Sequence, residues 1–241
     1  MRKAFAVLAL LILTVPACAQ SNPLRQAAAD GVKSMAWKIK TEGVSICCCE
    51  DEGQSWTNYG DRSRIEYTTV IVVAKMSGGR VTDLRMKEPN CPVKADRLVT
   101  ATNDESLDFL LDQLRDADRE GKYLSVIATH DHPRVVPELI RLARNDRSED
   151  VRKHALFWLG QKAGEKAAGE LERAVDEDPD DDVRQHAVFA ISQLPKDRSI
   201  PLLTKLVKTH KSPSVRKRAM FWLAQTGDQR ALDVIEDILA R

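Results

Sequence analysis

The chain has 241 residues, of which 43% are hydrophobic and 30% are charged, a composition typical of a folded globular protein. Its 37 basic and 36 acidic side chains give a formal net charge of +1, which excludes a global electrostatic attraction to nucleic acid or to an anionic membrane. Aromatic residues make up only 5%, and the abundance of Ala, Leu and charged residues favours helix over a sheet-rich sandwich or barrel.

The first 19 residues have the pattern of a secretory signal peptide. Two basic residues precede an apolar run over residues 4–13, and small residues follow at Ala17 and Ala19. The run is shorter than the roughly 20 residues that span a bilayer. We therefore expect cleavage after Ala19 and a secreted or periplasmic protein. Residues 15–18, Val-Pro-Ala-Cys, resemble a bacterial lipobox, so a lipid anchor at Cys18 is the alternative.

Residues 20–32 are expected to form a loose lead-in and residues 33–92 a small antiparallel β-domain. Met35, Trp37 and Ile39 occur at every second position, which is the period of a half-buried strand. Residues 66–76 are rich in β-branched side chains, Ser-Gly-Gly at residues 77–79 supplies a turn, and residues 80–86 form the partner strand.

Four cysteines follow the signal segment: Cys47, Cys48, Cys49 and Cys91. In an oxidising compartment such cysteines usually form disulfides. Successive residues of a strand point to opposite faces, so either face offers Cys91 a partner, and we prefer the pair Cys48 and Cys91. A thiol redox or metal sensor is an alternative function, although no Cys-x-x-Cys spacing occurs.

Residues 102–120 are expected to form a helix that caps a helical stack. Leucines at 107, 110, 111 and 114 give it one apolar face, and Thr102 with Glu105 makes a capping box at its start.

The rest of the chain is a repeat. VRKHALFWLGQ at residues 151–161 recurs as VRQHAVFAISQ from residue 183 and as VRKRAMFWLAQ from residue 215, an offset of 32 residues both times. After a short break, a second segment with an apolar stripe follows each copy, so each unit is a helical hairpin. Stacked copies cover each other's apolar seams, as in an α-solenoid. The same shift traces a degenerate fourth unit, so residues 121–241 hold about four repeats.

The VRxxAxFWLxQ units resemble short HEAT-like repeats of the kind also found in bilin lyases, particularly the copies in secreted bacterial proteins. The resemblance covers residues 121–241. With the segments before them, these units imply a mainly α fold: an α-solenoid of HEAT-like helical hairpins preceded by a small antiparallel β-domain. Such repeats mostly present binding surfaces, although the bilin-lyase relatives suggest a lyase-like or tetrapyrrole-carrier role as an alternative.

Three phenylalanines recur at the same place in each first helix. We expect Phe157, Phe189 and Phe221 to be buried between units, with truncation of Phe189 the most destabilising because the middle unit has neighbours on both sides.

Three arginines recur near the starts of the same helices. Arg152, Arg184 and Arg216 stand where the helix dipole disfavours a cation, so each needs an anionic partner. Aspartates of the preceding turns, such as Asp150 and Asp182, are the expected partners, in a ladder that links successive units.

The second helix of each hairpin is expected to line the concave face and to present the partner-binding surface, by resemblance to HEAT-like stacks. Its charges alternate in sign, which argues against nucleic acid, and pairing between units is the competing explanation for them. The candidate residues are Arg141, Arg144, Glu172, Arg173, Asp176, Lys205, Lys208, Glu236 and Asp237.

No motif for a catalytic nucleophile, a zinc protease, a dinucleotide or a phosphate loop occurs. The acidic run at residues 176–182 lacks the Gly and Glu of a calcium-binding EF-hand loop. His130, Asp131 and His132 are expected to form a solvated turn. We therefore expect a non-enzymatic interaction scaffold or adaptor that needs no cofactor or metal and binds another protein, with no nucleic acid and no membrane span.

Overall fold

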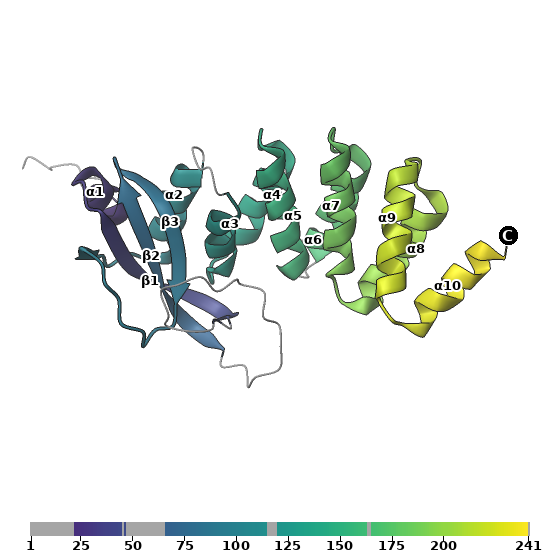
Figure 1. Cartoon of the computed structure of the whole chain (residues 1–241), viewed down its shortest axis with the longest axis horizontal. Helices are drawn as coiled ribbons and strands as arrows, with labels where there is room; N and C mark the ends of the chain where they lie inside the picture. Colours follow the sequence, from purple (N-terminus) through teal and green to yellow (C-terminus); the bar gives the residue numbers. More distant parts are fainter. Residues whose placement is uncertain (1–21, 45, 47–65, 115–119, 163–164, 241) are drawn as a thin grey trace, which may run out of the picture.

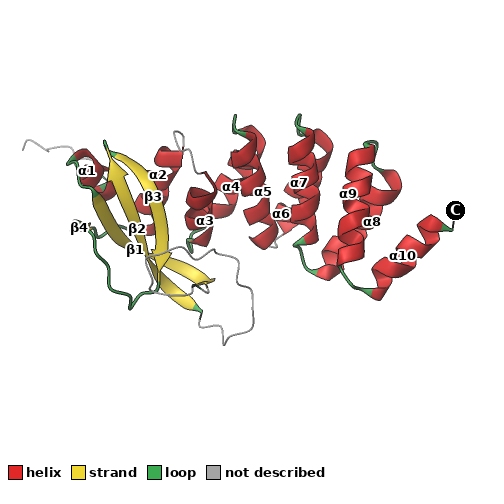
Figure 2. Ribbon diagram, in the orientation of Figure 1, coloured by secondary structure: helices red, strands yellow, loops and turns green. Residues whose placement is uncertain are grey.

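The computed structural model describes residues 22–44, 46, 66–114, 120–162 and 165–240. They form an elongated molecule with a small sheet at one end and a row of paired helices leading away from it (Figures 1 and 2). This arrangement confirms the predicted fold class. Within the described ranges, no helix is both long and apolar enough to cross a membrane. The predicted signal peptide and residues 115–119 of the predicted capping segment lie outside the described residues.

The lead-in contains a short helix, α1 (Pro23–Ala29), so the expectation of a loose segment over residues 20–32 is wrong there. Asn22 caps the helix, since its Oδ1 accepts hydrogen bonds from the amides of Leu24 and Arg25 at 3.0 and 3.3 Å. Seven residues are too few for a helix to be stable alone. Burial of Leu24, Ala27 and Ala28 supplies the missing stabilisation.

The sheet has four strands in the order β3-β2-β1-β4. β1 (Ser34–Val44), β2 (Tyr67–Ser77) and β3 (Arg80–Lys87) are antiparallel neighbours. The short edge strand β4 (Arg97–Leu98) runs parallel to β1. The β-domain therefore extends past residue 92 and is not purely antiparallel. The side chain of Asp96 fixes the extra strand, because its Oδ2 accepts from the amides of Lys33 and Ser34 at 2.9 and 3.0 Å.

The β2–β3 turn and the inner face of the sheet follow the predicted pattern. Gly78 and Gly79 have φ of 57° and 76°, the conformation that two-residue hairpin turns need. Trp37, Val72 and Met86 lie in register across β1, β2 and β3, and all three are buried. The Trp37 ring packs edge-on against Phe109, with the ring centroids 6.0 Å apart.

Nine helices follow the sheet in the part of the chain that the structure describes. α2 opens with the predicted capping box, in which the Thr102 amide donates to Glu105 and the Glu105 amide donates to the Thr102 hydroxyl. The helices are α2 (Asn103–Leu114), α3 (Glu120–Thr129), α4 (Val135–Asn145), α5 (Glu149–Lys162), α6 (Glu165–Glu177), α7 (Asp181–Ser192), α8 (Lys196–Thr209), α9 (Pro213–Gln225) and α10 (Gln229–Leu239).

The helices from α3 onward pair as hairpins, and the first helices α5, α7 and α9 pack side by side along the stack (Figure 1). In α5 the buried side chains are those of Val151, Arg152, Ala155, Leu156 and Leu159. Their counterparts in α7 and α9 are also largely buried. One continuous core runs from α1 and the sheet to the last hairpin, so the sheet and the stack share a hydrophobic interior.

A candidate protein-binding surface

The three repeated phenylalanines are not buried between units, which corrects the prediction for Phe157, Phe189 and Phe221. Phe157 and Phe189 are half-buried and Phe221 is 49% exposed. The reason is the helical phase. Ala155 and Leu156 point into the core, and the next residue along the helix is turned about 100° away from it.

The phenylalanines instead form an aromatic row on the outer face of the first helices. The Phe157 and Phe189 rings stack at 6.0 Å with their planes 12° apart. Trp222 continues the row at 4.9 Å from Phe189, and Phe221 lies edge-on to Trp222 at 5.0 Å. Trp158 packs edge-on against Phe157 at the other end. These five rings are the aromatic row.

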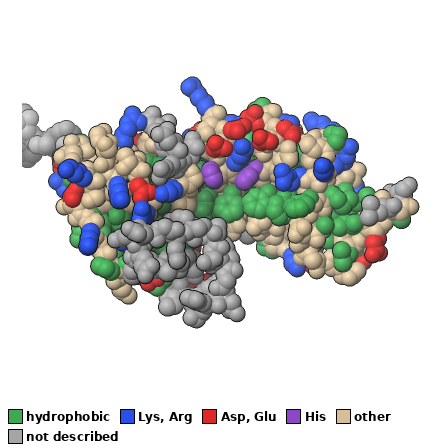
Figure 3. All heavy atoms as spheres, viewed as in Figure 1, with side chains coloured by type: hydrophobic (Ala, Val, Ile, Leu, Met, Phe, Trp, Pro, Cys, Tyr) green, Lys and Arg blue, Asp and Glu red, His purple; other side chains and the backbone are tan. Residues whose placement is uncertain are grey.

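The space-filling view shows this row as part of a hydrophobic band across the front of α5, α7 and α9 (Figure 3). Exposed apolar surface that continues over several elements is typical of interaction sites. Aromatic residues are also enriched at the centres of protein interfaces. The first helices therefore present the kind of surface that is predicted for the second helices.

Around the aromatic row, the outer face repeats in four parallel tracks, one residue per helix in each. Within each helix the four track positions are separated by four, three and four residues, and positions with this spacing lie on one face of a helix. The first track reads Asp150, Asp182 and Ser214. The next reads His154, His186 and Arg218, followed by the three phenylalanines. The amide track is Gln161, Gln193 and Gln225, all exposed.

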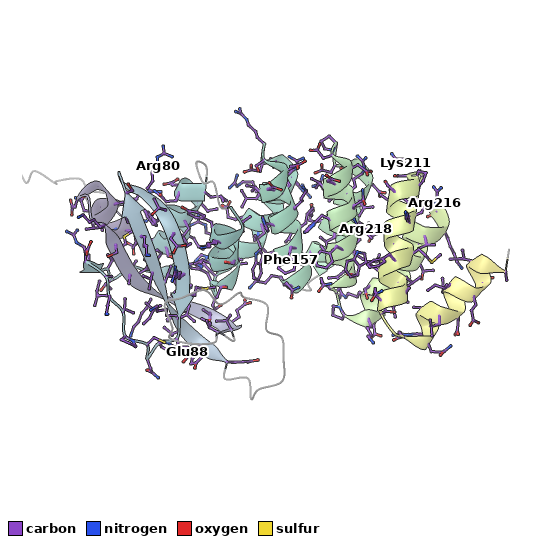
Figure 4. All side chains as sticks on the ribbon, viewed as in Figure 1. Arg80, Glu88, Phe157, Lys211, Arg216 and Arg218 are labelled. Carbon is purple, nitrogen blue, oxygen red and sulfur yellow. The ribbon has the colours of Figure 1, made fainter. Side chains whose placement is uncertain are left out.

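The charges on this face are divided along its length. Glu149 and Asp150 lie at the start of α5 and pair with Lys153, at 3.1 and 3.4 Å. At the other end α9 has no acidic residue, and Lys217 and Arg218 are exposed. Within the described residues, neither of these two cations pairs with a carboxylate. Figure 4 marks Phe157 on α5 and Arg218 at the opposite, basic end of the face.

The predicted partner surface on the second helices is made of charges that pair with one another. Between neighbouring second helices, Arg144 Nε donates to Glu170 at 2.7 Å, and Lys205 Nζ donates to Glu172 at 2.7 Å. At the last junction, Lys208 Nζ lies 3.4 Å from Asp237.

The remaining charges of that surface are mostly paired as well. Arg141 and Arg173 pair within their own helices, with Glu138 at 2.7 Å and Glu170 at 3.0 Å. Asp176 Oδ1 lies 3.3 Å from His210 Nε2, beside a cavity of about 280 Å³ between α6 and α8. Glu236 is exposed. This geometry favours the competing explanation, in which the charges link the units.

The predicted arginine ladder has one charged rung, and its anions differ from those expected. Arg152 pairs with Asp178 and Asp180 in the turn between α6 and α7, which joins its own unit to the next, with Nε 3.0 Å from Asp178 Oδ2. Its NH1 group donates to the carbonyl of Asp146 at 3.0 Å. The predicted partners Asp150 and Asp182 are wrong, because the guanidinium extends toward the turn between α6 and α7. The Arg152 and Asp178 side chains are only 8% and 6% exposed.

The other two arginines lack that rung. Moving 32 residues along from Asp178 gives His210, so Arg184 has no buried aspartate to pair with and instead lies 2.9 Å from Asp181 in its own helix. Arg184 and Arg216 keep the bonds to the carbonyls of the preceding turn, at 2.6 Å for Asp178 and 2.7 Å for His210. Among the three repeated arginines, Arg152 therefore makes the one buried ion pair of the ladder.

A buried polar chain, which no motif in the sequence predicts, joins the sheet to the helices. Trp37 Nε1 donates to Ser106 Oγ at 2.7 Å, Ser106 Oγ lies 2.8 Å from His130 Nε2, and His130 Nδ1 lies 2.7 Å from the Val126 carbonyl. His130 is fully buried, so the expectation of a solvated turn is wrong for it. Burial lowers the pKa of His130 to about 4. Its neighbour His132 faces Asp104 at 3.3 Å.

Cys91 is buried and disulfide-bonded. Its candidate partners, residues 47–49, lie outside the described residues, so the pairing with Cys48 stays a prediction.

The comparison with protein families identifies the stack. The family of HEAT repeats matches residues 107–192 and 170–241, which together span more than half of the chain. The chain belongs to the HEAT repeat family, which confirms the resemblance drawn from its repeated units.

The chain is also similar to a solved structure, that of the complex of CpcE and CpcF of phycocyanin lyase from Nostoc sp. PCC7120. The match has 15% sequence identity and a TM-score of 0.43, and it covers 56% of this chain and 89% of that chain. No curated protein matches the chain by sequence.

Proposed function

We propose that the protein is a non-enzymatic interaction scaffold that acts in the periplasm or outside the cell, and that its binding surface is the outer face of α5, α7 and α9. The signal-peptide pattern of residues 1–19 supports the location. The membership in the HEAT repeat family supports the scaffold role.

The observation that carries the proposal is the aromatic row. Five aromatic rings lie across three units with Phe221 half in solvent, although the core of the stack is filled by Val, Ala, Leu and Ile side chains. Leaving apolar rings in contact with water costs about 25 cal/mol per Å² of apolar surface. A protein partner that covers the row recovers that free energy.

Site-specific photo-crosslinking tests this assignment. We would place a photoreactive amino acid at Gln225, on the outer face of α9, and in a matched variant at Lys205, on the second helix α8. Both positions are exposed. We expect protein adducts in an extracytoplasmic extract of the native host from position 225 and far fewer from position 205. Equal yields from the two positions, or adducts only from position 205, would reject the outer face as the binding surface.

A further inference from the structure

We infer that the partner covering the aromatic row is a second copy of this chain, which binds face to face through α5, α7 and α9. This inference rests on the proposed function, since it names the occupant of the same surface. It follows from how the four tracks and the charges of that face are ordered along the stack.

A two-fold axis that lies in the interface, parallel to α7, makes the face complementary to itself. Such an axis places α5 of one copy on α9 of the other and α7 on α7. Rotation about this axis does not change the position of a residue along the helix direction. Each track therefore faces the same track of the second copy, and aromatic side chains face aromatic side chains. Phe157 then faces Phe221 of the second copy, and Gln161 faces Gln225, whose amide group offers both a donor and an acceptor.

The same operation brings opposite charges together. Glu149 and Asp150 of one copy come to the α9 end of the other, where Lys217 and Arg218 have no carboxylate partner among the described residues. Arg218 leans toward α7, because its guanidinium donates to Gln185 at 3.1 Å. It therefore faces the groove between α5 and α7 of the second copy, where Asp150 and Asp182 stand on either side.

The size of the face sets the expected strength. Three helices about 20 Å long and about 10 Å apart present roughly 600 Å² per copy, which is near the lower limit for a specific interface. We therefore expect a reversible dimer whose population rises with protein concentration. Charge steering should make its formation weaken as salt concentration rises.

Sedimentation equilibrium of the full mature chain over a wide range of concentration tests the inference. The wild-type protein should dimerise, and Phe221→Asp should weaken dimerisation by at least about tenfold, because it buries an unpaired charge against the opposite aromatic row. Leu232→Asp is the matched control, since Leu232 is a similarly exposed apolar residue on α10. It should leave the dimer unchanged, and urea unfolding of both variants would show that they fold.

Charge swapping tests the orientation. The variants Lys217→Glu/Arg218→Glu and Glu149→Lys/Asp150→Lys should each dimerise at least about tenfold more weakly than wild type, and mixing the two should restore association. A wild-type chain that stays monomeric at all concentrations, or a dimer insensitive to Phe221→Asp, would overturn the inference. A monomeric chain that still forms adducts with another protein from position 225 would leave the proposed scaffold function standing.

Discussion

At the scale of single residues, His130 has the largest expected effect on how stability depends on pH. It completes a hydrogen-bond chain in which both of its ring nitrogens already have a partner. If Ser106 donates to His130 Nε2, then Nδ1 donates to the Val126 carbonyl and the ring is neutral. A second ring proton, on Nε2, would place an N–H donor against the Ser106 hydroxyl, which is itself the donor in this hydrogen bond. Burial therefore favours the neutral form and lowers the pKa of His130 to about 4.

The pH dependence of stability follows from this shift. An unfolded histidine titrates near 6.5, so between pH 6.5 and 4 the unfolded chain binds a proton that the folded chain does not. The free energy of unfolding should fall as the pH is lowered through that window, by on the order of 3 kcal/mol for His130 when the pH reaches 4. His186, whose pKa burial also lowers to about 4, adds to the same slope.

Urea unfolding at a series of pH values, with His130→Gln and His186→Gln as variants, measures how much each histidine contributes to the pH dependence of the unfolding free energy. We expect the His130→Gln chain to be less stable at pH 7, because the polar chain is broken, but to lose less stability on acidification. If the pH profile of the variant ran parallel to that of the wild-type protein, the histidine would not be the cause.

The arginine ladder gives a second prediction at this scale. Arg152→Ala removes the cation from Asp178, which is buried, and should cost about 3 to 5 kcal/mol of unfolding free energy. Arg184→Ala is the matched control at the same position of the next unit, where the partner Asp181 is 43% exposed, and should cost about 1 kcal/mol or less. Equal losses of unfolding free energy for the two variants would mean that the buried Arg152–Asp178 pair contributes no more than the exposed Arg184–Asp181 pair.

At the scale of elements, the contact between α5 and α7 depends on a glycine. A methyl group built on Gly160 would lie 2.7 Å from the carbonyl oxygen of Ala190, which is too close for a real contact. The missing side chain therefore lets the two first helices approach each other. The loss of helix propensity, about 1 kcal/mol relative to Ala, is the cost of this approach.

A pair of glycine substitutions separates propensity from packing. Gly160→Ala should destabilise the protein by about 1 to 3 kcal/mol, because a backbone carbonyl must move. Gly169→Ala in α6 has no atom within 4 Å of the added methyl group and should stabilise the protein by about 0.5 to 1 kcal/mol. Thermal unfolding should therefore shift in opposite directions, and shifts of the same sign would contradict the packing role.

The elements also show which features could be predicted from sequence. The 32-residue period predicts the hairpins because every unit repeats the same local pattern. Short elements such as α1 and β4 have no pattern of their own and exist through contacts with Asn22, Asp96 and the shared core. For Phe157 and its equivalents, hydrophobicity suggested burial, but the helical phase set by Ala155 and Leu156 determines the outward direction.

The pairing of the charges on the second helices could not be predicted from sequence for a related reason. In sequence, the charges of the second helices stand out and their partners are invisible, because Arg144 and Glu170 or Lys205 and Glu172 come together only when the units stack. The hydrophobicity of the phenylalanines predicts that they fill the core, whereas the structure leaves them partly exposed. The 32-residue repeat itself shows that the same residue types recur at the outward positions of the first helices, as Phe157, Phe189 and Phe221 do.

At the scale of the whole molecule, the sheet and the stack are one folding unit. Trp37 on β1 packs on Phe109 of α2 and bonds Ser106, and the Tyr123 hydroxyl of α3 donates to the Val81 carbonyl of β3 at 2.9 Å. The sheet therefore covers the N-terminal end of the stack with a large apolar face. The last hairpin, by contrast, packs against α7 and α8 of the unit before it.

Two truncations test this asymmetry. A chain lacking residues 20–101 exposes the Phe109 side of α2 and removes the donor from Ser106, so a buried polar chain and a wide apolar face are both left uncovered. A chain lacking residues 213–241 removes one terminal unit, which costs a linear array only one interface. We expect far-UV circular dichroism to show a folded stack with a cooperative urea transition for the second chain and a loss of cooperative unfolding for the first. If the chain without the sheet kept the urea midpoint of the full protein, the stack would fold independently and the shared core would contribute little to its stability.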